Sequence, residues 1–210
     1  PRFERVRVRQ ALAVTGSDGV TQERLAALAA RSTKAAELLD RTSATWLRLW
    51  LREGDAGICH VAQADFRGLP AALQERILGR IVAHYGGGQG SPDAEELRRL
   101  ALWALGGDGP VRCTLGGAVL GRRRSGFWAT REAGRIPAAP ETVPDDGKLL
   151  WDRRFLVEAP AGSQVTPAAN RQLELAGDVP VFARRAYPWV ETPPGGSGPV
   201  RISFRRLNSG

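Results

Sequence analysis

The hydrophobic periodicity of the chain changes after Gly106-Gly107, and this change constrains the fold more than any single motif does. Before it, apolar residues recur three or four positions apart, which is typical of amphipathic helices. After it, short apolar runs are separated by Gly- and Pro-rich turns, which is typical of antiparallel strands. The sequence therefore predicts an α+β fold, with an all-α helical domain over residues 1–107 and a smaller, mainly antiparallel β domain over residues 108–210.

Three helices are expected in the first part of the chain, over about residues 21–53, 70–84 and 91–105. Thr21 is a suitable N-cap for the first helix, and Ser91-Pro92 provides a cap and a first-turn proline for the third. The glycine-rich stretch 86–90 follows a helix and lacks the G-K-[ST] ending of a phosphate-binding loop, so we interpret it as a helix stop. We expect the apolar stripe of the first helix to be core. Its members are Leu25, Leu28, Ala35, Leu38, Leu39, Trp46, Leu49 and Trp50.

Most strands are expected in the second part, where a Pro-rich link spans residues 133–147. Gly116-Gly117 lies inside one expected strand and indicates a bulge or a close approach of another backbone segment. A short helix is expected near Ala168 to Leu175. The expected strands are Ile58 to Ala62, Val111 to Leu120, Phe127 to Arg131, Leu149 to Glu158, Val181 to Arg184 and Val200 to Arg206.

The net charge of +8 comes almost entirely from arginine, since Lys34 and Lys148 are the only lysines. Arginine binds phosphate oxygens through its planar fork and stacks on bases, so a clustered arginine surface favours a polyanionic partner. The hairpin expected around Arg122 to Gly126 carries the densest cluster.

Motifs for chemistry are missing from this sequence. Cys59 and Cys113 belong to no C-x-x-C pair and have no metal-ligand spacing, so we expect reduced thiols and no metal site. No serine stands in a G-x-S-x-G motif. No stretch is apolar enough to cross a bilayer or to act as a signal peptide, so we expect a cytoplasmic protein with no membrane partner.

Three stretches carry a resemblance to a known family: RFERVRVRQAL (2–12), LPAALQERILGRIVAHYGG (69–87) and TLGGAVLGRRRSGFWATRE (114–132). In this order and spacing, the chain resembles the C-terminal part of bacterial tRNA(Ile)-lysidine synthases, a family of PP-loop ATP-pyrophosphatases. The strand LLWDRRFLVE (149–158) is similar to a later β segment of the family. Because the chain opens with Pro1 and contains no methionine, we expect it to be part of a longer protein.

The resemblance implies a function for the whole protein. Members of the family use ATP to adenylate the wobble cytidine in the CAU anticodon of an isoleucine tRNA, and lysine then attacks to form lysidine. The ATP loop lies in an N-terminal catalytic domain that this chain lacks, so we expect no catalytic residue and no cofactor here, with ATP and Mg²⁺ implied for that domain. Arg5, Arg7 and Arg9 match the arginine-rich segment after it, with Val6 where asparagine is common.

The family's C-terminal regions help to hold the tRNA, so the resemblance implies tRNA binding and orientation for this chain. Phosphate contacts fix the register of a nucleic acid without reading its sequence, and arginines are suited to them. A second, weaker group of candidates lies on the helices and includes Arg98 and Arg99. The arginines that we expect to bind RNA are Arg122, Arg123, Arg124, Arg131, Arg153, Arg154, Arg76 and Arg80.

Alternatives remain open at this point. The chain could be a non-catalytic adaptor that docks another protein and uses its arginines for solubility only. A different tRNA-modifying ATP-pyrophosphatase, such as a thiolation enzyme, is disfavoured because those enzymes commonly need C-x-x-C pairs. The sequence does not distinguish a monomer from a homodimer.

Overall fold

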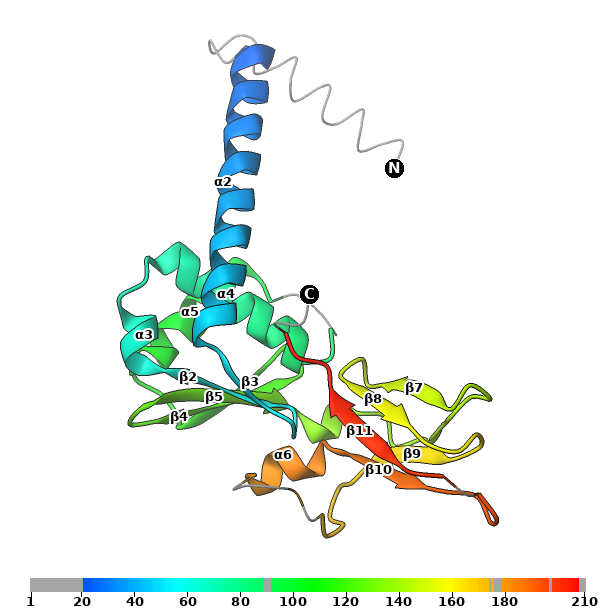
Figure 1. Ribbon diagram of the computed structural model, residues 1–210. Helices are drawn as coiled ribbons and strands as arrows, with labels where there is room; N and C mark the ends of the chain where they lie inside the picture. The colour runs from blue at the N-terminus through cyan, green and yellow to red at the C-terminus, as the bar shows by residue number, and fades with distance from the viewer. Residues whose placement is uncertain (1–20, 89–91, 174, 176–178, 197, 208–210) are drawn as a thin grey trace. The chain divides into compact units, whose positions relative to one another are not determined.

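The computed structural model describes residues 21–88, 92–173, 175, 179–196 and 198–207. Helices come first along the chain and several small antiparallel sheets follow, so the fold is α+β (Figure 1). The helical part is modest, however, and is not a clear separate domain, because a strand from the first half pairs with the second half. The chain divides into two compact units between Thr42 and Ser43, and not at the expected position after residue 107.

Helix α2 (Gln22–Trp50) begins after Thr21, whose hydroxyl accepts a hydrogen bond from the N–H of Arg24 at 3.3 Å. It ends earlier than expected, because strand β1 (Arg52–Gly54) follows directly. Much of its apolar stripe is exposed, including Leu28 and Leu38, and Trp46 is the stripe member that is buried. The expectation that this stripe is core is therefore wrong for most of the helix.

The second unit is built on a five-stranded antiparallel sheet in the order β1-β2-β5-β4-β3. Strand β2 occurs at the expected residues, Ile58–Ala62, and pairs directly with β5, with His60 opposite Trp128. Local periodicity could not reveal this pairing, because the two strands are far apart in sequence. The other strands are β3 (Arg112–Leu115), β4 (Ala118–Arg123) and β5 (Gly126–Arg131).

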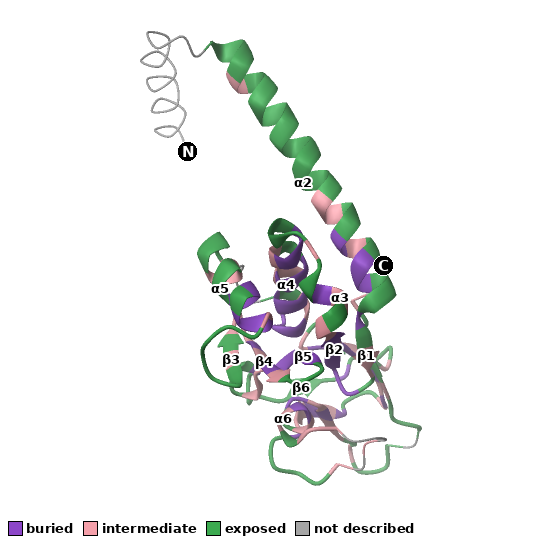
Figure 2. Ribbon diagram, turned by 90° about the vertical axis from the view of Figure 1, so that its left-hand side faces the viewer, coloured by how far each residue is buried: buried purple, intermediate pink, exposed green. Residues whose placement is uncertain are grey.

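Helices cover one face of this sheet, as Figure 2 shows. Helices α3 (Gln63–Arg67) and α4 (Ala71–Tyr85) pack on the strands, and α5 (Ala94–Ala104) packs beside α4. Helices α4 and α5 confirm the helices expected over about residues 70–84 and 91–105. The cap of α5 is Asp93, which forms a capping box with Glu96, and Ser91 lies outside the described residues. Helix α4 buries Leu73, Ile77, Leu78, Ile81, Val82 and Tyr85.

The opposite face is partly covered by α6 (Val181–Arg185). Its Phe182 stacks on Trp128 with ring centroids 4.1 Å apart and planes inclined by 13°. The sequence predicted a strand at Val181 to Arg184, and this prediction is wrong. A short apolar run such as this one can form either a strand or a helix. Here it forms a helix that packs apolar side chains on the face of the sheet. The described residues between 168 and 175 are not helical, so the helix expected there is also wrong.

Two tight turns were missed by the sequence analysis. Gly116 and Gly117 have φ of 54° and 81° and form the two-residue turn between β3 and β4, where a bulge or a close backbone approach within one strand was expected. The close approach is confirmed, because a Cβ added at Gly117 would lie 2.8 Å from the carbonyl oxygen of Gly86. Similarly, the single strand expected from Leu149 to Glu158 is a hairpin of β7 (Lys148–Trp151) and β8 (Phe155–Glu158). Its turn places Asp152 and Arg153 at φ of 45° and 57°, which is uncommon for residues other than glycine.

Two three-stranded sheets complete the second unit, in the orders β11-β8-β7 and β10-β9-β6. Strand β11 (Arg201–Phe204) confirms the last expected strand. None of the helices in the described ranges is long and apolar enough to cross a membrane. The remaining elements are η1 (Ala133–Arg135), β6 (Glu141–Thr142), β9 (Gln164–Pro167) and β10 (Pro188–Glu191).

The carboxylate of Asp152 lies between two buried arginines, and we call Arg131, Asp152 and Arg154 the buried ion cluster. Oδ2 of Asp152 accepts hydrogen bonds from Nε of Arg131 at 3.1 Å and from Nε of Arg154 at 2.8 Å. The Asp152 side chain is 7% exposed, and the arginine side chains are 0% and 1% exposed. Burial lowers the pKa of Arg154 to about 10, against the opposing effect of the Asp152 charge, so the guanidinium keeps its proton at neutral pH.

The buried ion cluster connects elements that are distant in sequence. Arg131 also donates to the carbonyls of Gly86 at 2.6 Å, Gly117 at 2.9 Å and Arg135 at 3.1 Å. These carbonyls belong to the end of α4, to the β3–β4 turn and to η1. Arg154 donates to the carbonyl of Ala186 at 3.2 Å, just after α6. The glycines that follow α4 do stop the helix, and they also provide a carbonyl for Arg131.

Replacing Asp152 by alanine leaves two buried guanidinium groups without their anion. Breaking a buried ion pair by removing one partner typically costs about 3–5 kcal/mol, so we expect Asp152→Ala to lower the free energy of unfolding by about that amount. Urea denaturation followed by circular dichroism measures it. Asp145→Ala, at an exposed loop position, serves as the control and should change stability by less than about 0.5 kcal/mol. Equal unfolding midpoints for both variants would contradict a structural role for the cluster.

Candidate nucleic-acid interface

The arginines that the sequence suggested as RNA ligands occupy three different environments. Arg131 and Arg154 are buried, Arg122 is half-buried against backbone carbonyls, and the others reach the surface to different degrees. Arg76, Arg123, Arg124 and Arg153 are exposed, whereas Arg80 is half-buried.

The expectation that Arg131 and Arg154 face a phosphate surface is corrected by their burial. Their guanidinium groups bind Asp152 and backbone carbonyls inside the second unit. The alternation of side chains along a strand could not predict the burial of Arg131, because packed elements cover both faces of β5 and every residue of that strand is buried. These two arginines stabilise the fold.

Arg122 holds the end of helix α5. Its Nη1 donates to the carbonyls of Trp103, at 3.0 Å, and Gly107, and its Nη2 donates to the carbonyl of Gly109 at 2.8 Å. The guanidinium carbon also lies 5.1 Å from the centroid of the Trp103 ring. A cation at the C-terminus of a helix binds carbonyls that have no partner within the helix. The main role of Arg122 is therefore structural.

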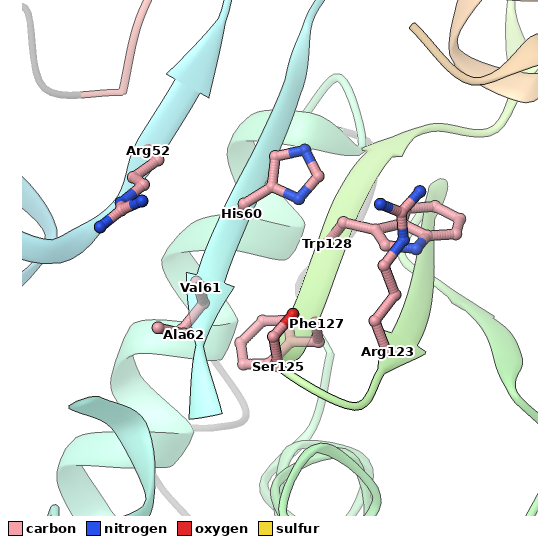
Figure 3. Close-up of a pocket in the computed structure, with 9 residues that line it drawn as sticks. Arg52, His60, Val61, Ala62, Arg123, Ser125, Phe127 and Trp128 are labelled. Carbon is pink, nitrogen blue, oxygen red and sulfur yellow. The ribbon is translucent and has the colours of Figure 1, made fainter. Parts of the chain in front are cut away.

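The tip of the β4–β5 hairpin places two exposed arginines, Arg123 and Arg124, between two hollows. The first, which we call the helix-side hollow, has a volume of about 360 Å³. The second, the sheet-side hollow, has a volume of about 370 Å³ and is drawn in Figure 3. Arg123 lines both hollows, so the hairpin separates two parts of one basic surface. The helix-side hollow is lined by Gln63, Arg67, Ala104, Leu105, Gly106, Arg122, Arg123 and Arg124.

The sheet-side hollow lies on the face of the five-stranded sheet opposite α3 and α4. Arg52, His60 and Trp128 occupy one row across β1, β2 and β5, since Arg52 pairs with His60 and His60 with Trp128. Arg123 lies on the same face, two residues beyond Gly121, the β4 partner of Trp128. Figure 3 shows these side chains around the hollow.

Four exposed arginines surround the hairpin, and we call Arg52, Arg67, Arg123 and Arg124 the tip arginines. None of their side chains forms a hydrogen bond or an ion pair with another described residue. Elsewhere, Arg135 pairs with Glu132 and Arg171 pairs with Glu191. The tip arginines therefore keep all their donors available for an anion from outside.

Sequence reasoning missed three contributors to this surface. Arg52, His60 and Arg67 were not among the expected RNA ligands. The β2–β5 register brings Arg52 and His60 to the hairpin, and a pairing between strands so distant in sequence leaves no local signal. Arg76, Arg80 and Arg153 line neither hollow.

The described residues offer little for covalent or metal chemistry. Burial raises the pKa of the Cys59 thiol to about 12 and that of the Cys113 thiol to about 11, so neither is a ready nucleophile. No group of three or more potential ligands could hold a metal ion within the described ranges. The segment with Arg5, Arg7 and Arg9 lies outside those ranges. What the described arrangement can do is bind an anion.

Comparison with known proteins identifies the relatives of this chain. It is 30% identical over 170 residues to a tRNA(Ile)-lysidine synthase of Rhizobium meliloti (strain 1021), covering 81% of this chain and 35% of that protein. It is 30% identical over 182 residues to a tRNA(Ile)-lysidine synthase of Hyphomonas neptunium, covering 87% of this chain and 46% of that protein. It is 34% identical over 161 residues to a tRNA(Ile)-lysidine synthase of Ruegeria pomeroyi, covering 76% of this chain and 36% of that protein.

This chain is homologous to part of the tRNA(Ile)-lysidine synthases. It spans between about a third and a half of the length of these curated relatives. The family resemblance noted in the sequence is thereby confirmed. No protein-family model matches the chain, and no solved structure matches it.

The structural role of Arg122 can be separated from the binding role of its neighbours. Hydrogen bonds from a charged donor contribute about 1.5–3 kcal/mol, so we expect Arg122→Ala to lower the free energy of unfolding by about 2 kcal/mol. Arg123→Ala and Arg124→Ala, which remove no described contact, should change it by less than about 0.5 kcal/mol. Urea denaturation of the three variants measures the difference. Three equal losses would show that Arg122 does not hold the end of α5.

Proposed function

We propose that this chain is the tRNA-holding part of a tRNA(Ile)-lysidine synthase. The observation that carries the proposal is the set of unpaired tip arginines on a chain homologous to those synthases. Arg135 and Arg171, by contrast, each form an ion pair with a nearby carboxylate. Four unpaired arginines around one hairpin provide a repulsive cluster that an RNA backbone would neutralise.

The shape of this surface suits a phosphate backbone. Two arginines project from the hairpin tip, and one more lines the hollow on each side, Arg67 on the helix side and Arg52 on the sheet side. Guanidinium groups bind phosphates in a forked geometry, which gives both affinity and orientation. Because phosphate contacts position a nucleic acid without reading its bases, the surface holds the tRNA and leaves recognition of the CAU anticodon to another part of the enzyme.

The chemistry of the complete enzyme belongs, in this proposal, to the part of the synthases that the chain does not match. ATP, Mg²⁺ and lysine are used there, the wobble cytidine of the isoleucine tRNA is adenylated there, and lysine is joined to it. This chain contributes by binding the tRNA body and orienting it toward that part. The complete protein is then an ATP-dependent ligase, whereas the chain alone binds tRNA and does not modify it.

A second candidate function is a protein-docking adaptor, which a separate apolar hollow favours. The hollow has a volume of about 340 Å³ and is lined by Leu150, Leu156, Ser203, Phe204 and Arg205. Leu150 is 45% exposed and Leu156 is 37% exposed. An adaptor would form a stoichiometric complex with a protein partner and would show no affinity for tRNA.

Salt-titrated binding to isoleucine tRNA with a CAU anticodon tests the tRNA-holding role. Each phosphate contact contributes about 0.7 to 0.9 to the slope of log K against log salt. We expect the double variant Arg123→Ala/Arg124→Ala to weaken binding by about tenfold or more in low salt, and to reduce the slope by up to about two contacts. Arg122 is left intact, because its loss would disturb α5.

The matched control is the double variant Arg135→Ala/Arg171→Ala, which removes the same charge from arginines that already have carboxylate partners. We expect it to bind tRNA nearly as well as the unaltered chain. Absence of tRNA binding by the unaltered chain at low salt would overturn the proposal. Equal losses in both double variants would show that total charge, and not the hairpin surface, determines binding.

A further inference from the structure

The sheet-side hollow has features that phosphate binding alone does not require. Besides Arg52 and Arg123, its lining includes His60 and Trp128, which forms an aromatic wall. Neighbouring residues at the end of β2 and the start of β5 complete the lining. Its volume of about 370 Å³ lies at the lower end of the range for sites that enclose small ligands, about 300–1,000 Å³. A space of this size suits one small planar group with a charged attachment, and not an RNA duplex.

The aromatic wall of this hollow is held rigidly. The indole of Trp128 lies across the sheet over Gly121, where an added Cβ would clash with the ring. On its other side the indole stacks on Phe182 of α6. Trp128 is only 4% exposed as a result, so it forms a fixed wall and does not have to be ordered by the ligand. Such preorganisation lowers the entropic cost of binding.

His60 is the polar group that distinguishes this hollow. Its imidazole is half-exposed beside Trp128 and forms no hydrogen bond with any described residue. Burial and the nearby charge of Arg123 lower the pKa of His60, so the ring is neutral at pH 7. A neutral imidazole has one N–H donor and one nitrogen acceptor, and its flat face can stack. A nucleobase edge offers the complementary donors and acceptors.

We propose that the sheet-side hollow binds a single unpaired nucleotide of the RNA, with the base stacked on the imidazole of His60 and bounded by the edge of the Trp128 ring, and with the adjoining phosphate at Arg123. This inference rests on the proposed tRNA-holding function and adds a subsite to it. Arg123 lines both hollows, so an RNA strand that follows the tip arginines passes the mouth of the sheet-side hollow. An unpaired base can leave the strand there, whereas a base within a duplex cannot.

The two histidines of the chain allow a direct test. His60 lines the hollow, whereas His84 lies on α4, which packs on the opposite face of the sheet, and is therefore an internal control. In the chain labelled with ¹⁵N-histidine, we expect cytidine 5′-monophosphate and a single-stranded tetranucleotide to shift the imidazole signals of His60 and to leave those of His84 unchanged. Inorganic phosphate should shift His60 much less. Equal shifts with phosphate, or none with either nucleotide probe, would overturn the proposal.

Binding to two RNA hairpins separates this inference from the proposed function. Both hairpins are closed by a hexaethylene glycol linker, so that neither has unpaired loop nucleotides. One carries four unpaired nucleotides at its 3′ end and the other is blunt, and we expect the tailed hairpin to bind the unaltered chain about tenfold more tightly. The variant His60→Ala should lose that preference and still bind the blunt hairpin. His60→Phe, which keeps a flat ring, should retain part of the preference. If both hairpins bind equally to all three proteins, the nucleotide subsite is wrong and the tRNA-holding function stands. If neither hairpin nor tRNA binds, both proposals fail.

Discussion

The carboxylate of Asp152 is the anion on which the packing of the second unit depends. It forms ion pairs with two arginines that are almost completely removed from water, and an isolated guanidinium in that environment would carry a large desolvation cost. The remaining donors of Arg131 bind three carbonyls from three different segments. Directional contacts thus fix β5, the β7–β8 turn and these three segments relative to one another.

This buried ion cluster also decides which arginines are available to a partner. The sequence presents Arg153-Arg154 and Arg131 as part of one basic β domain, yet the structure uses two of the three internally. Arg122 is likewise occupied, because it binds carbonyls at the end of α5. The surface that remains for a polyanion is centred on the hairpin tip and extends to Arg52 and Arg67, which come from other elements. Net charge therefore suggests a class of partner, whereas burial and register determine which arginines such a partner could reach.

Sequence reasoning succeeded where a signal is local. Helices α4 and α5 and strand β2 follow from apolar spacing, and the family relationship follows from the order of three short stretches. Expectations from the sequence were wrong where the structure depends on an unusual backbone conformation or on pairing between strands that are distant in sequence. The positive φ of Asp152 and Arg153 reverses a chain that carries no glycine at that turn, so one strand was expected where two occur. The pairing of β2 with β5 joins halves that looked like separate domains, and it places His60 beside Trp128.

Burial divides the arginines of this chain into those that build the fold and those that, in the proposed function, face RNA. Modification of arginine side chains by phenylglyoxal, mapped by peptide mass spectrometry with and without isoleucine tRNA, tests it most directly. We expect Arg67, Arg123 and Arg124 to react in the free chain and to be protected by tRNA, and we expect Arg131 and Arg154 to react in neither state. Reaction of Arg131 and Arg154 in the folded free chain, or tRNA that leaves Arg123 and Arg124 unprotected, would contradict it.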